Sequence, residues 1–262
     1  MIKKIIQVGN RKGGVGKTTT SVNVAWELVR AGYRVLLGDM DSQANGSSMV
    51  LDGETPHWLG DVLTDHRFDI RKAIYPAFID GCEVDGFDVL PGRGGDVMTK
   101  LDMEMISLTK REERLAMQLQ KVRDDYDFVI LDTSPGTSVL GLNAVIAADL
   151  YVIPTTYREM SLDGIGKFLA HISDVKLVDE DDIDFLILRT CLKRASKREL
   201  AYGNVRVETM WPDNLANTVI YDRAIFGEAE LSKMPISLFS KGHEAAAYYK
   251  DFTRELIKYV NK

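Results

Sequence analysis

A glycine-rich segment near the start of the chain contains the residue types that bind a polyphosphate. It consists of Lys12, Gly13, Gly14, Val15, Gly16, Lys17, Thr18 and Thr19, between an apolar strand-like run and a helix-like pattern. Backbone N–H groups of such a turn and of the following helix N-terminus point toward one place. Glycine lets the backbone approach the phosphates, Lys17 is placed to reach the β and γ oxygens, and the Thr18 hydroxyl is placed to bind Mg²⁺. The segment therefore predicts a phosphate-binding loop.

The loop departs from the strict pattern G-x-x-x-x-G-K-[ST]. Arg11 occupies the first position of that pattern and Lys12 the next, which makes the segment a deviant K-G-G-x-G-K-T loop. Lys17 already serves the phosphates, so Lys12 has no evident task within its own subunit. A surface lysine at a turn is the alternative interpretation.

Two later strand-like runs end in aspartates. The run RVLLGDMDSQ carries Asp39 and Asp41, and the run YDFVILDTSPG carries Asp132. In an open parallel sheet, ligands bind at the carboxyl ends of the strands, so these carboxylates are expected to converge on the phosphate loop. Thr18 and Asp132 fit a magnesium ion, the aspartate through a water, and Asp39 would support its hydration shell. A simple strand-end turn is the other explanation for Asp39 and Asp41.

These motifs resemble the ParA/MinD family of dimerising ATPases. The segments NAVIAADLYVIP and SLDG, at residues 143–154 and 161–164, extend the resemblance, which reaches about residue 249. It implies that Mg²⁺-dependent ATP hydrolysis uses Asp41 to position the attacking water and that Lys12 reaches the nucleotide of the partner across a two-fold interface. It further places Pro235 at the adenine pocket. The catalytic residues expected are thus Lys12, Lys17 and Asp41.

Two positions depart from that family. Ser42 and Ser134 stand where its members usually have proline, which relaxes the backbone of both segments. The strand pattern also begins at residue 3, which leaves no room for the helix-turn-helix domain found ahead of the ATPase core in longer ParA relatives. The resemblance is therefore to the short form.

Short apolar runs alternate with helix-period segments, which predicts an α/β fold with a mostly parallel twisted sheet flanked by helices. A single domain over residues 1–262, a deviant P-loop NTPase fold, accounts for the whole chain. The expected strands are 3–9, 34–39, 87–90, 128–132, 150–153, 184–189 and, more weakly, 218–221. The expected helices are 17–31, 97–106, 110–124, 137–147, 161–176 and 243–260.

Composition narrows the class of protein. Cys82 and Cys191 match no metal or redox spacing, so both are expected to be structural thiols in a reducing compartment. No signal peptide or membrane-length apolar run is present, and a cytoplasmic protein is expected. The net charge of -6 argues against a general nucleic-acid coat, yet six basic residues and one acidic residue lie between Arg189 and Arg206.

The leading hypothesis is a ParA-type partition ATPase. The resemblance implies that its ATP-bound homodimer binds non-specific double-stranded DNA on the nucleoid and that a ParB-type centromere-binding protein stimulates hydrolysis. The basic stretch between Arg189 and Arg206, together with Lys233 and Lys241, suggests the DNA face, because phosphate contacts need lysine and arginine. The candidate DNA contacts are Lys193, Arg194, Lys197, Arg198 and Arg223. A solvated helix face is the alternative for this stretch.

Two other functions remain open. A MinD-like membrane-cycling ATPase needs a C-terminal amphipathic anchor, and the stripe of Tyr248, Phe252, Leu256, Tyr259 and Val260 has helical spacing. We interpret that stripe as core packing, because it starts within the fold. An iron–sulfur reductase component or an amide-ligase relative has the same loop, but the two cysteines do not supply the pair that the reductase needs. A protein-positioning ATPase would share every motif, so the cargo is not specified.

Overall fold

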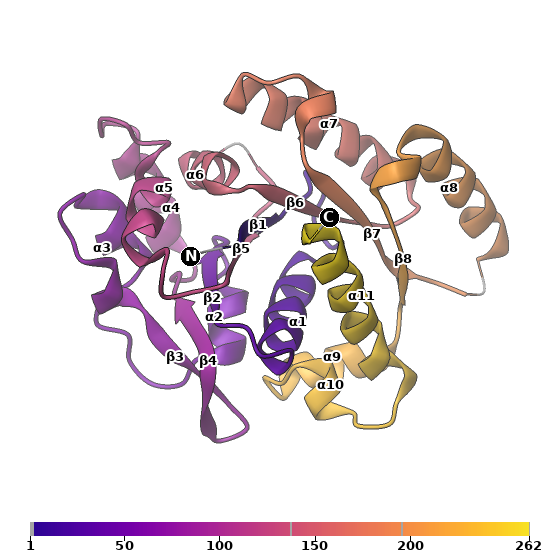
Figure 1. Ribbon diagram of the computed structural model, residues 1–262, viewed down its shortest axis with the longest axis horizontal. Helices are drawn as coiled ribbons and strands as arrows, with labels where there is room; N and C mark the ends of the chain where they lie inside the picture. Colours follow the sequence, from indigo (N-terminus) through magenta and orange to yellow (C-terminus); the bar gives the residue numbers. More distant parts are fainter. Residues whose placement is uncertain (1–2, 137, 195, 262) are drawn as a thin grey trace.

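The computed structural model describes residues 3–136, 138–194 and 196–261 and contains one eight-stranded sheet (Figure 1). The strand order is β3-β4-β2-β5-β1-β6-β7-β8, with β3 antiparallel to β4 and the other neighbours parallel. The strands are β1 Lys4–Val8, β2 Val35–Met40, β3 Tyr75–Ile79, β4 Cys82–Leu90, β5 Phe128–Thr133, β6 Leu150–Thr155, β7 Phe185–Leu192 and β8 Leu215–Tyr221.

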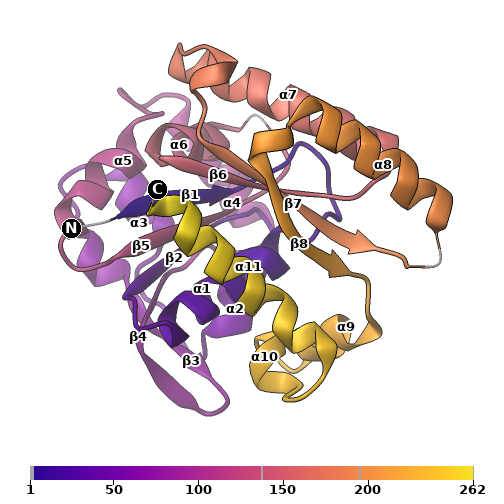
Figure 2. The ribbon, with the colours of Figure 1, turned by 45° about the vertical axis from the view of Figure 1, so that its right-hand side comes forward.

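Helices cover both faces of the sheet. They are α1 Lys17–Arg30, α2 Asn45–Val50, α3 Leu59–Thr64, α4 Asp96–Met105, α5 Arg114–Leu119, α6 Val139–Ala147, α7 Glu159–Lys176, α8 Lys197–Met210, α9 Ala224–Leu231, α10 Ile236–Phe239 and α11 Glu244–Val260. Helices α1 and α11 lie on one face and α7 and α8 on the other, as both views show (Figures 1 and 2). None of the described helices is long and apolar enough to cross a bilayer.

The central strands are buried on both sides because successive side chains point to opposite faces. In β1, Ile5 packs with the cluster under α3 to α6, whereas Ile6 and Val8 pack with the cluster under α1 and α11. A third cluster joins α7 and α8 to β6 and β7. Because both faces are apolar, these strands appear in the sequence as continuous hydrophobic runs, and this made them predictable.

The predicted α/β class, the parallel central sheet and the order of its elements are confirmed, with shifts at element ends. The expected helix 110–124 is shorter: Lys110 has φ 50°, α5 starts at Arg114, and a 3₁₀ turn, Gln120–Val122, follows it. Residue 137, the first of the expected helix 137–147, lies outside the described residues.

Several elements were not predicted. The edge strand β3 contains Pro76, and its hairpin with β4 turns at Asp80 and Gly81, both with positive φ. A two-residue Asp-Gly connection is a strong hairpin signal, and it lies in the sequence at Asp80 and Gly81. The polar helix α8 was predicted only as an alternative, a solvated helix face without bounds, because its moderate amphipathicity carries little periodic signal.

Candidate nucleotide-binding site

The glycine-rich segment forms the turn between β1 and α1. Gly14 and Gly16 have φ of 72° and 76°, a region that residues with a Cβ rarely adopt, and α1 begins at Lys17. Val15 is buried, and its carbonyl accepts a hydrogen bond over 2.8 Å from Oγ1 of Thr190 at the end of β7. The turn is therefore fixed against the sheet at the N-terminus of a 14-residue helix that has no side-chain cap.

Lys17 folds back over this turn. Its ammonium Nζ donates to the carbonyl oxygen of Lys12 over 3.1 Å, and its side chain is buried. Burial lowers the pKa of Lys17, and the charges of Asp132 and Asp41 partly oppose that shift. The ammonium group of Lys17 thus lies at the turn, where it could face an anion, and it is close enough to Asp132 and Asp41 to interact with their charges.

Asp39 and Asp132 lie one residue before the ends of the neighbouring strands β2 and β5, in register with each other. Both are fully buried, and burial raises the pKa of each. The charge of Asp39 raises the pKa of Asp132 further, whereas hydrogen bonds from the side chains of Thr18 and Ser21 lower it. Oγ of Ser21 donates to Oδ1 of Asp132 over 2.9 Å.

The other oxygen of Asp132, Oδ2, is buried and has no hydrogen-bond partner among the described residues. An unpartnered buried carboxylate oxygen beside a second carboxylate is where a divalent cation or its water would bind. Thr18, Asp39 and Asp132 therefore fit a metal with few protein ligands. The described residues contain no cluster of three or more acidic, histidine or cysteine side chains that could hold an ion alone, so phosphate oxygens would have to complete the coordination.

Asp41 and Lys12 flank this centre. The backbone N–H of Asp41 donates to Oδ1 of Asp39 over 3.1 Å, and Oδ1 of Asp41 accepts from the N–H of Gln43 over 2.9 Å. The backbone N–H of Lys12 donates to Oδ1 of buried Asn10 over 2.9 Å. The structure thus brings together the predicted loop, Asp39, Asp41 and Asp132 at one edge of the sheet.

A groove of about 240 Å³ opens beside the loop and extends to the ends of β6 and β7. It is lined by Lys12, Gly13, Gly14, Val15, Thr156, Arg158, Ser161, Cys191, Lys193 and Asp222. Cys191 is exposed at this groove, and its Sγ lies 3.6 Å from where a Cβ on Gly16 would stand; its expected structural role stays a prediction. Cys82 is exposed as well.

Pro235 does not line that groove. It is buried at the start of α10, and the N–H of the next residue, Ile236, donates over 2.8 Å to Oδ1 of Asn23 on α1. Its adenine contact stays a prediction.

The candidate DNA residues fall into two groups. Arg194 and Arg223 both pair with the carboxylate of Glu244, and both guanidinium groups lie over the ring of Tyr221. Lys193, Lys197 and Arg198 are exposed near the end of β7 and the start of α8.

Two arginines of the wider basic stretch are not free for DNA. Arg189 is buried, and its Nη2 donates to the carbonyl oxygens of Ala216 and Asn217 over 2.8 and 3.1 Å. Arg206 pairs with Asp163 on α7 over 2.7 Å. The assignment of Arg189 to an exposed basic face is wrong, because a central strand position takes its side chain inside.

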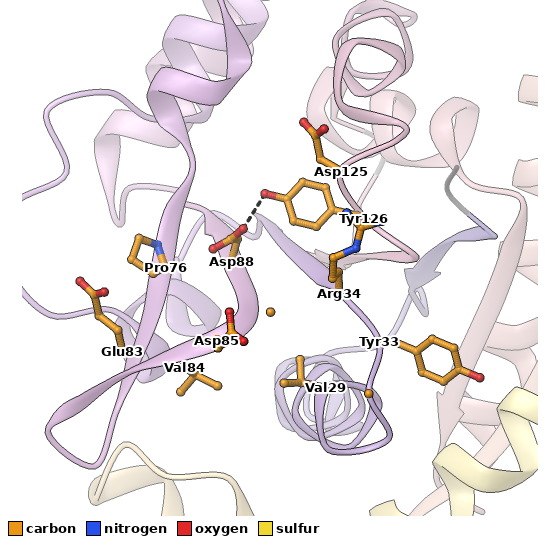
Figure 3. Close-up of a pocket in the computed structure, with 12 residues that line it drawn as sticks. Val29, Tyr33, Arg34, Pro76, Glu83, Val84, Asp85, Asp88, Asp125 and Tyr126 are labelled. Atoms are coloured by element: carbon orange, nitrogen blue, oxygen red, sulfur yellow. Dashed lines mark hydrogen bonds between the residues drawn. The ribbon is translucent and has the colours of Figure 1, made fainter.

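A larger cleft, of about 680 Å³, lies at the opposite edge of the sheet, between the β3–β4 hairpin and the end of α1 (Figure 3). Its lining includes Glu83, Asp85 and Asp88, and the hydroxyl of Tyr126 donates to Oδ2 of Asp88 over 2.7 Å. None of the predicted site residues lines this cleft.

A protein-family model described as "AAA domain" matches residues 3–185. The sporulation initiation inhibitor protein Soj of Bacillus subtilis is 30% identical over 265 residues, which cover 97% of this chain and 98% of Soj. This chain belongs to the AAA-domain family of ParA/MinD-type ATPases. Another member, the chromosome partitioning protein ParA of Caulobacter vibrioides, is 29% identical over 97% of this chain and 94% of its own length.

Solved structures agree with the ParA/MinD-type fold. The cell division ATPase MinD of Pyrococcus furiosus superposes with a TM-score of 0.79 at 21% identity, over 98% of this chain and 99% of MinD. Cobyrinic acid a,c-diamide synthase of Mycobacterium smegmatis, with bound ADP and magnesium, superposes with a TM-score of 0.78 at 24% identity, over 100% of this chain and 96% of the synthase chain. The predicted deviant P-loop NTPase fold is confirmed.

Some residues of this site carried signals that the sequence analysis did not use. Ser21 lies one helical turn after Lys17, where a small hydroxyl side chain can face the strand ends. Ser47 and Gly46 follow the acidic motif within a few residues. Arg158 and Cys191 are separated from the loop by more than a hundred residues, so only the sheet order brings them to it.

Proposed function

We propose that this protein is a ParA-type partition ATPase that binds ATP with Mg²⁺, dimerises and attaches to DNA. The observation that carries the proposal is the position of Lys193, which lines the groove beside the phosphate loop and begins the exposed basic segment that continues into α8. The groove beside the loop and the basic surface therefore adjoin each other at Lys193. The partition function named for the Caulobacter relative is consistent with this arrangement.

Hydrolysis requires charge neutralisation on the γ-phosphate and an oriented water. Bound Mg²⁺ would supply electrostatic stabilisation of the phosphates, held by Thr18 and, through water, by Asp132 and Asp39. Lys17 exchanges its bond to the Lys12 carbonyl for the β and γ oxygens. Asp41 accepts a hydrogen bond from the attacking water and orients it.

Lys12 completes the site of a second copy of the chain. Its backbone is held on both sides, by Asn10 at the N–H and by Lys17 at the carbonyl, while its side chain lines the groove. We infer that the side chain of Lys12, on this fixed backbone, reaches the phosphates of the partner across a two-fold interface. Dimerisation therefore depends on nucleotide.

We assign non-specific DNA contact to Lys193, Lys197 and Arg198, with smaller contributions from Arg194 and Arg223. The last two share one carboxylate, so together they present about one net positive charge in place of two. A dimer doubles the number of these positive charges. A single acidic monomer has too few of them on one face to bind duplex DNA. A ParB-type centromere-binding protein would then stimulate hydrolysis, and the ATPase would release the nucleoid DNA.

Binding to a random-sequence duplex tests this function. We expect binding only with ATP and Mg²⁺, no sequence preference, and a loss of affinity with salt of slope near -0.9 per phosphate contact. The measurement is surface binding or gel shift at several salt concentrations, with ADP as the matched control. Equal binding without nucleotide, or none at low salt, would count against the partition role.

A protein-cargo-positioning ATPase is the second candidate. Tyr202, Val205 and Met210 on α8 are 55%, 66% and 53% exposed, which suits a protein contact better than a phosphate contact. The MinD-like membrane alternative has less support, because Phe252 and Leu256 of the C-terminal stripe are fully buried in the core and its other members pack against it. A partner that copurifies through α8 while DNA binding is absent would favour the cargo function.

A further inference from the structure

The first turn of α2 lies directly against the two buried carboxylates. A Cβ added to Gly46 would stand 3.2 Å from Oδ2 of Asp39 and 3.4 Å from Oδ2 of Asp132. The unpartnered oxygen of Asp132 therefore faces space that exists because residue 46 has no side chain. That space lies between the two groups that would receive the metal and its water.

Ser47, the next residue, holds one of these carboxylates through two hydrogen bonds. Its backbone N–H donates to Oδ2 of Asp39 over 2.6 Å, and its Oγ donates to the same oxygen over 2.8 Å. The same Oγ accepts from the N–H of Gly92 over 3.0 Å, at the end of β4. The hydroxyl thus donates to Asp39 and accepts from the backbone just after β4.

This arrangement leaves Asp39 little freedom. Its other oxygen, Oδ1, accepts from the N–H of Asp41, so the carboxylate is held from both sides of the β2 end. At Gly92, an added Cβ would stand 2.6 Å from the carbonyl oxygen of Asp39, so the backbone of Asp39 is confined there too. A hydroxyl that fixes a carboxylate near a metal determines the metal's affinity as well as the fold.

We propose that Ser47 is a positioning residue for the magnesium centre and that Gly46 keeps open the space for the ion's hydration shell. The inference rests on the proposed Mg²⁺–ATP site. Ser47 acts through Asp39 and touches no nucleotide. Its removal weakens the response to Mg²⁺ and leaves the metal-independent contacts of the phosphate loop in place.

The test compares Ser47→Ala with the neighbouring Ser48→Ala. Ser48 is exposed in the same helix, and its Oγ bonds only locally, to the Asn45 carbonyl over 2.9 Å, which makes it a matched control. Binding of a fluorescent ATP analogue is measured against Mg²⁺ concentration and again in excess EDTA. Losses of about 10-fold or more in metal affinity are usual when such a supporting group is removed.

We expect Ser47→Ala to raise the half-saturating Mg²⁺ concentration by about tenfold and to leave binding in EDTA unchanged. Ser48→Ala should match the parent, and Ser47→Thr should restore the Mg²⁺ response because threonine keeps the hydroxyl. An unchanged Mg²⁺ response in Ser47→Ala, or an equal weakening in EDTA, overturns the positioning role.

Gly46→Ala provides a second, independent variant. Its methyl group crowds both carboxylate oxygens, so we expect a weaker Mg²⁺ response with intact binding in EDTA. Gly166→Ala on α7, where an added Cβ meets nothing within 4 Å, is the control for a helical glycine. A Mg²⁺ response in Gly46→Ala equal to that of the parent contradicts the proposed spacing. If the parent protein shows no Mg²⁺-dependent nucleotide binding, both the proposed function and this inference fail. If the parent protein binds Mg²⁺ and nucleotide but not DNA, the partition function fails and the inference about Ser47 and Gly46 stands.

Discussion

At the scale of residues, the site keeps one buried cation beside two buried carboxylates. Burial lowers the pKa of Lys17 and raises the pKa of Asp39 and Asp132, because removal from water disfavours the charged form of each group. The charges of Asp132 and Asp41 partly offset the shift of Lys17. An anion near Lys17 and a cation near Asp39 and Asp132 would each favour the charged form of these groups.

Lys17→Ala and Asp41→Ala should have different effects. Lys17 is the buried cation at the turn, so its removal should abolish ATP binding. Asp41 is placed to orient water, so its removal should leave ATP bound, trap the dimer and reduce hydrolysis by about 100-fold or more. Equilibrium binding and single-turnover hydrolysis distinguish the two, and parental turnover in Asp41→Ala would remove that residue from the mechanism.

Lys12 can be tested with linked heterodimers. Losing a charge-assisted contact costs about 1.5–3 kcal/mol, which is about tenfold or more in turnover. When one subunit carries Lys12→Ala and the other Lys17→Ala, the single bound nucleotide keeps the partner's lysine, so activity should persist. When both changes are in one subunit, the nucleotide of the parental subunit lacks that lysine, and activity should fall. The reverse result would mean that Lys12 acts within its own subunit.

At the scale of elements, α8 is attached to the sheet by a close approach at Gly203. A Cβ at this position would lie well inside van der Waals contact with the ring of Tyr157. The hydroxyl of Tyr157 donates to Oδ1 of Asn204, and Nη1 of buried Arg189 donates to the same oxygen over 3.3 Å. These contacts determine where the basic start of α8 lies relative to the groove.

Gly203→Ala should therefore destabilise the protein by about 1–3 kcal/mol through overpacking. Gly227→Ala on α9 is the matched control: its Cβ meets nothing within 4 Å, so we expect a neutral or slightly stabilising effect of about 0.4–1 kcal/mol. Thermal and urea unfolding measure both variants. Equal stability of the two would show that α8 moves freely over Tyr157.

At the scale of the whole molecule, function is concentrated at one edge of the sheet. The phosphate loop, Asp39 and Asp132 lie at the carboxyl ends of parallel strands, whereas the acidic cleft around Asp88 lies at the opposite edge. With a net charge of -6, long-range electrostatics repel DNA except where basic residues gather. The exposed basic residues around the start of α8 lie beside the phosphate loop, on the side of the sheet away from the acidic cleft.

Reversing Lys197 and Arg198 to glutamate should therefore lower the affinity for DNA by at least about tenfold and leave basal ATP hydrolysis near the parental rate. Lys193 is left unchanged because it lines the nucleotide groove. Reversing Lys72 and Lys100, exposed residues outside the nucleotide groove, gives a control of equal charge. Equal losses in both double variants would mean that net charge, and not this surface, governs attachment.

The sequence alone determined the parts of the structure that depend on interactions between neighbouring residues. The phosphate loop, the buried central strands and the aspartates at their ends were predictable, because glycine spacing, continuous apolar runs and strand-end positions each act over a few residues. The core packing of the C-terminal stripe was predictable for the same reason, since Phe252 and Leu256 have helical spacing. Edges and weakly amphipathic segments such as β3 and α8 were not.

The tertiary structure alone decided which distant groups meet. The alternation of strand β7 places Arg189 inside and leaves Lys193 beyond its end, although both lie in one basic stretch. Strand order brings Cys191 beside Gly16, and the path of the chain after β2 brings Gly46 and Ser47 back over Asp39 and Asp132. Such contacts depend on how segments far apart in the sequence align with one another. Local residue patterns do not show that alignment.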